Sequence, residues 1–318
     1  MRILITGSSG FVGSHMALAL THACGAKVAI LATSKTAMVH PTYGIITALN
    51  VLDRAAVSEA VQLYAPTHIL HLAGIASPAA ANANPRLAWD AHLGSVLNLS
   101  DAIREHAPEC WLMHVGTGMV YGASAKSGEP LDEDTPLAPM DCYAASKAGA
   151  DLALGAMSHG NLKCIRFRPF NHSGPRQSED FVIPAFAMQI ARIEAGLAAP
   201  VLRVGNLDAE RDFLDVRDVA AAYALATQQT ASLGAGTILN IASGIPRRVG
   251  DILDALLVRA RVPITVSRDP RRMRPSELPR IVGDAQRARA ALRWSPRYEF
   301  HEMIADVLEY ARSRVCQS

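Results

Sequence analysis

The chain has 318 residues, of which 50% are hydrophobic, 5% aromatic and 19% charged, with a formal net charge of +2. This length suits one large domain or two coupled ones, and the small net charge gives no reason to expect nucleic acid or a membrane surface as a partner. No apolar run approaches the roughly 18 residues that a membrane-spanning helix needs. A strand pattern that starts at Arg2 leaves no room for a signal peptide, so we expect a cytoplasmic protein.

The cysteines argue against a disulfide framework and against a zinc site. Their number is odd, five, and they form neither a C-x-x-C motif nor a cluster with histidines. We therefore expect no bound metal.

Apolar runs alternate with longer amphipathic patterns over the first 170 residues. The runs predict strands, and apolar residues at three- and four-residue spacing predict helices between them. Such alternation favours an α/β fold with a parallel sheet covered on both faces, whose ligands bind beyond the carboxyl ends of the strands. Strands are expected at 2–6, 27–32, 44–49, 68–73, 110–116 and 162–168, and helices at 14–23, 54–64, 93–106 and 143–159.

This rhythm breaks after about residue 170, where a stretch rich in proline, glycine and polar residues begins. Helices are expected at 184–196, 249–260 and 301–314, and a strand followed by a helix at 211–229. We expect a sheet domain over 1–170 and about 208–243, and a smaller substrate-binding domain over 171–207 and 244–318.

Three glycines at three-residue intervals, Gly7, Gly10 and Gly13, lie between the first predicted strand and the first predicted helix. In this position they would permit a tight turn, let a pyrophosphate approach the backbone, and let the helix pack close to the sheet. A plain flexible turn is the alternative. The G-x-x-G-x-x-G spacing is typical of short-chain dehydrogenases and reductases.

The second strand ends without the acidic residue that usually binds the ribose hydroxyls of NAD. Thr33, Ser34 and Lys35 follow instead, and the first acidic residue of the chain is Asp53. A 2′-phosphate would meet no repelling carboxylate, which favours NADP(H) and leaves NAD(H) use open. The alternative is that Lys35 simply faces solvent.

A Y-x-x-x-K pair, Tyr143 and Lys147, begins a predicted helix. Residues four apart share a helix face, so the lysine is expected to lower the pKa of the tyrosine and make it an acid–base group. Thr117, at the end of the fifth strand, offers a hydroxyl to the oxygen of a substrate carbonyl. The alternatives are a surface helix and a turn threonine.

With these motifs the chain resembles the extended short-chain dehydrogenase/reductase family, in its nucleotide-sugar branch, over nearly its full length. The resemblance implies a Rossmann-like doubly wound sheet with a smaller C-terminal substrate domain, and a homodimer formed through two helices of the Rossmann domain. It also implies a set of residues that would border the cofactor: Gly7, Gly10, Phe11, Val12, Gly13, Thr33, Ser34, Lys35, Asn50, Val51, Leu72, Ala73, Gly74, Tyr143 and Lys147.

Dehydratases of this branch carry an acidic residue beside the threonine, where this chain has Gly118 and Met119. Dehydration is therefore not expected, and reduction or epimerisation at C4 remains as the expected reaction. The segments 168–186, 211–218 and 269–284 resemble reductases of GDP-4-keto-6-deoxy-mannose. This implies NADPH-dependent reduction of the C4 ketone of a GDP-4-keto-6-deoxy-hexose, to GDP-D-rhamnose or its C4 epimer, with a heptose analogue also conceivable.

The same resemblance implies the substrate-binding residues. Thr117 would orient the carbonyl, an amide and several arginines would bind the pyrophosphate, and a glutamate would bind a ribose or base. Asn171 as a turn former, and Arg211 paired with Asp215 or Asp218, are the alternatives. The substrate set is Thr117, Asn171, Arg176, Arg211, Arg274 and Glu277.

One departure from the family pattern is Ala91, where related enzymes commonly have asparagine, with Asp90 and His92 as candidates to compensate. Two other functions stay open. One is a nucleotide-sugar 4-epimerase with tightly bound NAD, and the other is a dinucleotide-binding protein without catalysis.

Overall fold

The computed structural model describes residues 1–25, 28–273 and 278–317. Its centre is an eight-stranded sheet in which every neighbouring pair is parallel except β3 and β4. This confirms the predicted α/β class and parallel sheet. The strands run in the order β11 (Thr237–Ile241), β7 (Cys164–Pro169), β6 (Trp111–Val115), β5 (His68–His71), β1 (Arg2–Thr6), β2 (Ala29–Ser34), β4 (Gly44–Ala48) and β3 (Met38–His40).

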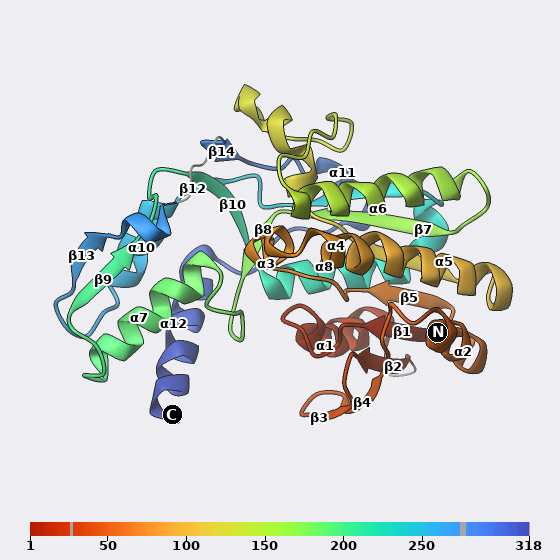
Figure 1. Ribbon diagram of the computed structural model, residues 1–318, viewed down its shortest axis with the longest axis horizontal. Coiled ribbons are helices and arrows are strands. Elements are labelled where there is room, and N and C mark those ends of the chain that lie inside the picture. Colours follow the sequence, from red (N-terminus) through yellow and green to blue (C-terminus); the bar gives the residue numbers. More distant parts are fainter. Residues whose placement is uncertain (26–27, 274–277, 318) are drawn as a thin grey trace.

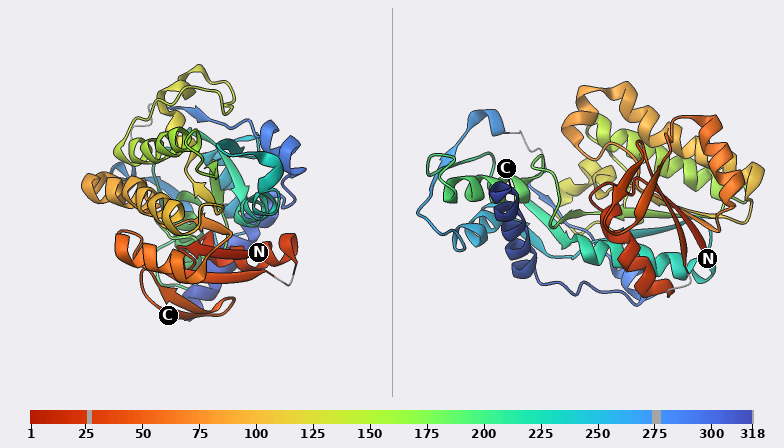
Figure 2. Two further views of the ribbon diagram at one scale, coloured as in Figure 1. Left: turned by 90° about the vertical axis from the view of Figure 1, so that its right-hand side faces the viewer. Right: turned by 90° about the horizontal axis from the view of Figure 1, so that it is seen from below.

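Successive residues of a strand point to opposite faces of the sheet. Both faces therefore carry apolar side chains, and helices cover both. Ile3 and Ile5 pack into one hydrophobic cluster, while Leu4 between them packs into another. Figure 2 (right) shows helices on either side of the strands. One face carries α1 (Gly13–Cys24), α8 (Val216–Gln228) and α11 (Gln286–Leu292), and the other carries α2 (Arg54–Tyr64), α5 (Ser95–His106) and α6 (Cys142–Ser158).

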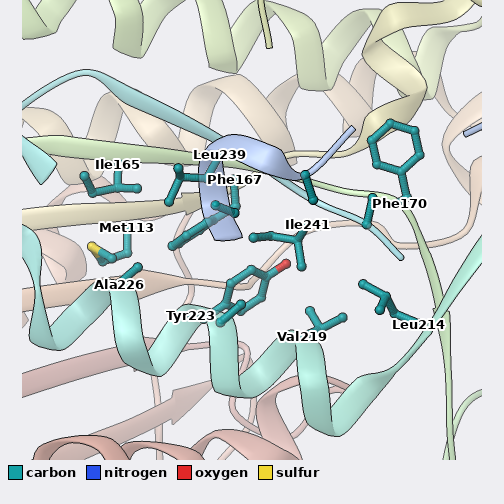
Figure 3. Close-up of a cluster of buried hydrophobic side chains, with 14 of the residues drawn as sticks. Met113, Ile165, Phe167, Phe170, Leu214, Val219, Tyr223, Ala226, Leu239 and Ile241 are labelled. Atoms are coloured by element: carbon teal, nitrogen blue, oxygen red, sulfur yellow. The ribbon is translucent and has the colours of Figure 1, made fainter. Parts of the chain in front are cut away.

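The first of these clusters is the larger core. Tyr223 of α8 points from its helix toward the strands, where its ring lies 4.5 Å from that of Phe167 (Figure 3). Both side chains are fully buried. The region between α8 and the middle of the sheet is therefore a packed interior, and ligands must bind at the strand ends.

A smaller part of the molecule lies beside the sheet domain (Figures 1 and 2) and has its own hydrophobic cluster. Three helices form most of it, α7 (Val182–Glu194), α10 (Val249–Leu257) and α12 (Phe300–Cys316), with the strand pair β9 (Val201–Val204) and β13 (Thr265–Arg268). Leu278, Leu292 and Trp294 pack instead into the cluster of α1 and α8. The division into two domains stays a prediction.

A second, short sheet extends from the larger part into the smaller one. Its central strand is β10 (Glu210–Asp215), which pairs with β12 (Pro246–Arg248), with β14 (Arg280–Ile281) and with β8 (Asn171–Ser173). This short sheet therefore brings β8, which follows β7, next to strands from the substrate half of the chain.

Several elements were absent from the prediction. These are the strands β3, β8, β9, β11, β12, β13 and β14, the helix α11, the short helices α3 (Pro78–Ala83), α4 (Pro85–Trp89) and α9 (Thr230–Leu233), and the 3₁₀ helices η2 (Gly118–Ser127) and η3 (Pro270–Arg272). A π-helical turn, η1 (Asp90–Gly94), overlaps the start of the helix predicted at 93–106, so α5 begins later, at Ser95.

No helix among the described residues has the length and apolar character to cross a membrane. The described part of the chain also holds no group of three or more metal-ligating side chains.

Candidate functional site

The glycine loop joins β1 to α1 and is closed too tightly for side chains. Gly7 has a φ of +73°, and a Cβ there would lie 2.8 Å from the backbone nitrogen of Ala73. A Cβ on Gly13 would lie 2.7 Å from the carbonyl oxygen of Ser8. The loop leads directly into the N-terminus of a 12-residue helix, whose free N–H groups favour an anion. This cradle fits the pyrophosphate of a dinucleotide.

The carboxyl end of β5 touches this loop at the point where the strand order reverses between β1 and β5. Such reversal points are where open α/β sheets bind ligands. Leu72, Ala73 and Gly74 lie there, as predicted for residues that border a cofactor. On the other side of β1, Asn50 and Val51 follow β4; the Asn50 side chain accepts a hydrogen bond from the N–H of Leu52.

The end of β2 holds the three residues predicted to meet a 2′-phosphate. The Thr33 hydroxyl donates to the carbonyl of Ile5 at 2.9 Å, and the Ser34 hydroxyl donates to the carbonyl of Thr36 at 2.6 Å. Each hydroxyl proton is therefore already engaged. Lys35 is exposed, so its ammonium group is the one side-chain donor of this trio that is directed to solvent.

Thr117 lies at the carboxyl end of β6, where it caps η2. Its hydroxyl oxygen accepts the N–H of Met119 at 3.2 Å, so the hydroxyl proton can be donated elsewhere. Gly118 packs against Phe170, since a Cβ at this glycine would lie 3.0 Å from the phenyl ring. The place of the dehydratase acid is therefore apolar and tightly packed.

Tyr143 and Lys147 lie in the first two turns of α6, which Asp141 caps by accepting the N–H of Ala144 at 2.7 Å. Both side chains are buried, and the Thr117 hydroxyl lies near enough to Tyr143 to lower the pKa of its phenol. Lys147 donates from Nζ to the carbonyl of Val115 at 2.9 Å. The structure thus brings together the three predicted catalytic residues, Thr117, Tyr143 and Lys147, from β6 and α6.

Burial changes the acidities of this pair in opposite directions. It raises the pKa of Tyr143 to about 12, against a smaller lowering by the nearby hydroxyl of Thr117. It lowers the pKa of Lys147 to about 8. The expectation that Lys147 lowers the tyrosine pKa is therefore wrong for the chain as described, because burial dominates and the ammonium group is directed to Val115. The phenol is held protonated, as a proton donor needs to be.

The two candidates to compensate for Ala91 differ in their surroundings. Asp90 is half exposed and pairs with Arg86 on the outer surface. His92 is buried, and its ring meets that of Tyr143 edge to face at 5.6 Å. Only His92 therefore contacts the candidate catalytic residues.

The predicted substrate residues fall into separate places. Asn171 on β8 pairs with Phe213 on β10, two residues along from Arg211. Arg211, with its guanidinium donating to the carbonyl of Glu210 at 2.7 Å, lies on the same strand face as Phe213. Arg274 and Glu277 lie outside the described residues.

Arg176 is placed elsewhere, in a cleft of about 570 Å³ between the glycine loop and the helices α7 and α12. It shares this cleft with Ser9, Gly10 and Phe11 rather than with Thr117 or Tyr143. Arg176 is thus nearer to the dinucleotide cradle than to the other predicted substrate residues.

Arg247 is a candidate that sequence reasoning missed. It lies directly opposite Arg211 in the antiparallel pair of β12 and β10, and its guanidinium stacks on Phe300 at 3.9 Å. Burial lowers the pKa of both arginines. Two adjacent cations on one sheet face favour an anion between them. No local pattern marks Arg247, because its strand is only three residues long.

Comparisons with known proteins agree with this geometry. The model of the family described as GDP-mannose 4,6 dehydratase matches residues 4–307. GDP-6-deoxy-D-mannose reductase of Pseudomonas aeruginosa is 31% identical over 318 residues, covering 99% of this chain and 98% of that protein.

Solved structures match over the same extent. RMD from Pseudomonas aeruginosa complexed with NADPH has a TM-score of 0.85 at 30% identity, covering 98% of this chain and 99% of that one. UDP-glucose 4-epimerase of Thermus thermophilus in complex with NAD has a TM-score of 0.82 at 29% identity, covering 98% and 99%. The chain therefore belongs to the GDP-mannose 4,6 dehydratase family, within the nucleotide-sugar branch of the extended short-chain dehydrogenases and reductases.

Proposed function

We propose that the protein is an NADPH-dependent reductase of the C4 ketone of a GDP-4-keto-6-deoxy-hexose. The product is GDP-D-rhamnose or its C4 epimer. The observation that carries this proposal is the buried Thr117–Tyr143–Lys147 set with a protonated phenol, beside a position that holds no acid for dehydration. The likeness to the GDP-6-deoxy-D-mannose reductase of Pseudomonas aeruginosa supports the same reaction.

In this reaction NADPH supplies a hydride to C4 of the sugar. Tyr143 donates its phenolic proton to the C4 oxygen, which becomes a hydroxyl group. Thr117 holds that oxygen by donating its free hydroxyl proton. The Lys147 ammonium group, charged below about pH 8, would stabilise the phenolate that Tyr143 leaves and would hold the nicotinamide ribose.

The dinucleotide would lie across the glycine loop, with Gly10, Phe11, Val12 and Gly13 at its pyrophosphate and Gly74 near its ribose. Lys35 would bind the 2′-phosphate, while Thr33 and Ser34 hold the strand end in place through their bonds to backbone carbonyls. The likeness to RMD complexed with NADPH supports NADP(H). Use of NAD(H) as well depends on how much affinity Lys35 contributes.

The substrate pyrophosphate would lie over the face of β10 that carries Arg211. Asn171 would donate its amide, and Arg247 would supply a second guanidinium beside that of Arg211. Arg274 and Glu277 remain candidates by resemblance. Arg176, by its place beside Ser9 and Gly10, suits the dinucleotide phosphates better than the substrate.

A nucleotide-sugar 4-epimerase is the second candidate, supported by the likeness to the epimerase of Thermus thermophilus. Both reactions take Tyr143 through a phenolate, so burial of the phenol does not separate them. The end of β2 favours the reductase, because it carries no acidic side chain for the ribose hydroxyls of a tightly held NAD. Stoichiometric NAD retained through purification would favour the epimerase.

The test supplies purified protein with NADPH and the product that a GDP-mannose 4,6-dehydratase makes from GDP-mannose. We expect NADPH absorbance to fall and the reduced sugar to appear by NMR. Tyr143→Phe should lower kcat about 10²- to 10⁴-fold, the contribution typical of a general acid, with NADPH affinity retained. Tyr64→Phe, on the far end of α2, is the matched control. No NADPH oxidation with any GDP-keto sugar would contradict the proposal.

We further propose a cytoplasmic homodimer formed through α5 and α6, which lie side by side on one face of the sheet (Figure 1). Leu97 and Leu152 are exposed on these helices, at 39% and 60%. Apolar side chains on two adjacent helices suit a self-complementary contact.

A further inference from the structure

We propose that His92 is a positioning residue for the reduction, which fixes the helix of Tyr143 against the segment that borders the nicotinamide ribose. The imidazole bridges two parts of the site. Nδ1 lies 2.7 Å from the hydroxyl of Ser146 on α6, and Nε2 lies 3.2 Å from the backbone nitrogen of Ile75. The kinetic part of this inference rests on the proposed function.

The bridge reaches the catalytic tyrosine by two routes. Ser146, bonded to His92, itself donates to the carbonyl of Tyr143 at 3.0 Å. The His92 ring also meets the Tyr143 ring edge to face, with an interplanar angle of 85°. His92 therefore restrains both the backbone and the ring of Tyr143.

On its other side the bridge sets the course of the chain after β5. Gly74 packs against the imidazole, since a Cβ there would lie 3.1 Å from Cδ2 of His92 and 3.6 Å from Nζ of Lys147. Because Ser146 donates its proton to the carbonyl of Tyr143, Nδ1 of the neutral ring donates to Ser146 and Nε2 accepts the N–H of Ile75. Gly74 is thus fixed between His92 and Lys147.

The π-helical turn explains how a histidine reaches this place. In η1 the N–H of Ser95 bonds to the carbonyl of Asp90, five residues back, so one extra residue is accommodated within the run from α4 to α5. Ala91 and His92 are turned inward, and His92 is only 1% exposed. A buried polar ring in an irregular turn is retained at a cost, which positioning would justify.

The ring acts while neutral. Burial, reinforced by the nearby charge of Lys147, lowers the pKa of His92 to about 3. The other titratable groups beside it are Tyr143, His71 and His114, and burial also lowers the pKa of both histidines. His92 therefore bonds and packs but does not exchange a proton during turnover.

Four variants separate these contacts. His92→Asn keeps an amide near the position of Nδ1 and so retains the link to Ser146. His92→Gln keeps an amide near the position of Nε2 and so retains the link to Ile75. His92→Phe keeps the ring and loses both links. His68→Gln is the control, because His68 is also buried, lies at the start of β5, away from the site, and bonds to Thr230.

For His92→Phe we expect kcat to fall about 10- to 100-fold, as displacements near 1 Å at a reacting centre can cause, with KM for the GDP-keto sugar changed less than about threefold. The kinetic isotope effect with NADPH deuterated at the transferred position should rise, because hydride transfer becomes limiting. His92→Asn and His92→Gln should each restore part of kcat, and His68→Gln should match the wild type. The apparent pKa values of the pH profile of kcat should be the same in every variant as in the wild type.

Hydrogen exchange of the Ile75 amide gives a readout that needs no turnover. It should speed up in His92→Phe and His92→Asn but not in His92→Gln. Unchanged kcat and isotope effect in a folded His92→Phe, or loss of a pH limb, would overturn the positioning role. A wild type that binds NADPH but reduces no GDP-keto sugar would overturn the proposed reaction instead. Even in that case, an unaltered exchange rate of the Ile75 amide in His92→Phe would overturn the hydrogen-bonded bridge through His92.

Discussion

Burial of two titratable side chains decides the protonation states on which the reaction depends. Burial raises the pKa of Tyr143 to about 12, so its phenol is protonated near neutral pH. Lys147, with its pKa lowered to about 8, loses its charge as the pH rises through that value. The rate of reduction should therefore fall above about pH 8, because the phenolate left by Tyr143 then loses its neighbouring cation.

Burial of Lys147 also lowers the free energy of unfolding. Its pKa in the folded chain lies below the ordinary value of 10.5, so between pH 8 and 10.5 the unfolded chain binds a proton that the folded chain lacks. Stability should rise with pH over that window, and the full cost is present below pH 8. The shift corresponds to about 3 kcal/mol, at about 1.4 kcal/mol per pKa unit.

We predict that Lys147→Met stabilises the protein without ligand by about 1 to 3 kcal/mol at pH 7, the loss of the bond to Val115 offsetting part of the gain. The variant should reduce no substrate at a measurable rate. Urea unfolding at pH 7 and pH 9.5 measures the effect. The difference between the two proteins should shrink at the higher pH, and a variant less stable than the wild type at pH 7 would contradict the prediction.

At the scale of elements, regular patterns were predictable and local irregularities were not. The strand 2–6 and the helix 54–64 have the predicted bounds, because an unbroken apolar run marks the first and an unbroken helical periodicity marks the second. The π-helical turn at Asp90–Gly94 has no periodicity of its own, and it was predicted in part as ordinary helix. Strand β3, which pairs with the predicted strand β4, has Met38 and Val39 exposed, so no alternation with polar residues marks it.

The candidate site shows the same difference between short motifs, which the sequence reveals, and contacts that depend on the fold. Gly7, Gly13, Thr117, Tyr143 and Lys147 could be proposed from the sequence because each lies in a short motif at the end of a regular element. His92 and Arg247 act through partners distant in the chain, Ser146 and Arg211, and only the folded structure brings these together. The hydroxyls of Thr33 and Ser34 donate to backbone carbonyls whose positions cannot be predicted from the sequence.

The glycine loop is an element whose geometry can be tested directly. We predict that Gly13→Ala destabilises the protein by about 1 to 3 kcal/mol, because the added Cβ would overlap the carbonyl oxygens of Gly7 and Ser8. NADPH should bind at least about tenfold more weakly, since the loop must open and its N–H groups then diverge.

Gly160→Ala is the matched control, because a Cβ at this exposed turn has its nearest neighbour 3.5 Å away, at the carbonyl of Met157. Thermal unfolding and fluorescence titration with NADPH measure the two effects. Equal NADPH affinity in Gly13→Ala and the wild type would show that the loop is not the pyrophosphate cradle.

At the scale of the whole molecule, the candidate site combines residues from both parts of the chain. The cradle and the catalytic set come from the carboxyl ends of the large sheet, whereas Arg211 and Arg247 come from the short sheet that extends into the smaller part. The two parts are tied by Arg217 of α8, which bonds to Asp306 of α12 at 2.7 Å. A substrate between them would contact both parts at once, which suits a reaction that needs water excluded.

The proposed homodimer concerns the face of the molecule opposite to α1 and α8. Leu152 of α6 is 60% exposed, and Leu97 of the neighbouring α5 is 39% exposed. We predict that the wild type sediments as a dimer and that Leu152→Arg sediments as a monomer, because an arginine at a two-fold contact places two like charges near each other in an apolar interface.

Leu18→Arg is the matched control, since Leu18 is 62% exposed on α1, on the other face of the sheet, and its variant should remain dimeric. Sedimentation equilibrium over a hundredfold range of protein concentration distinguishes the cases. NADPH affinity should be retained in both variants, because neither residue belongs to the cradle. A wild type that is monomeric throughout, or a dimer that Leu18→Arg breaks and Leu152→Arg leaves intact, would contradict an interface built from α5 and α6.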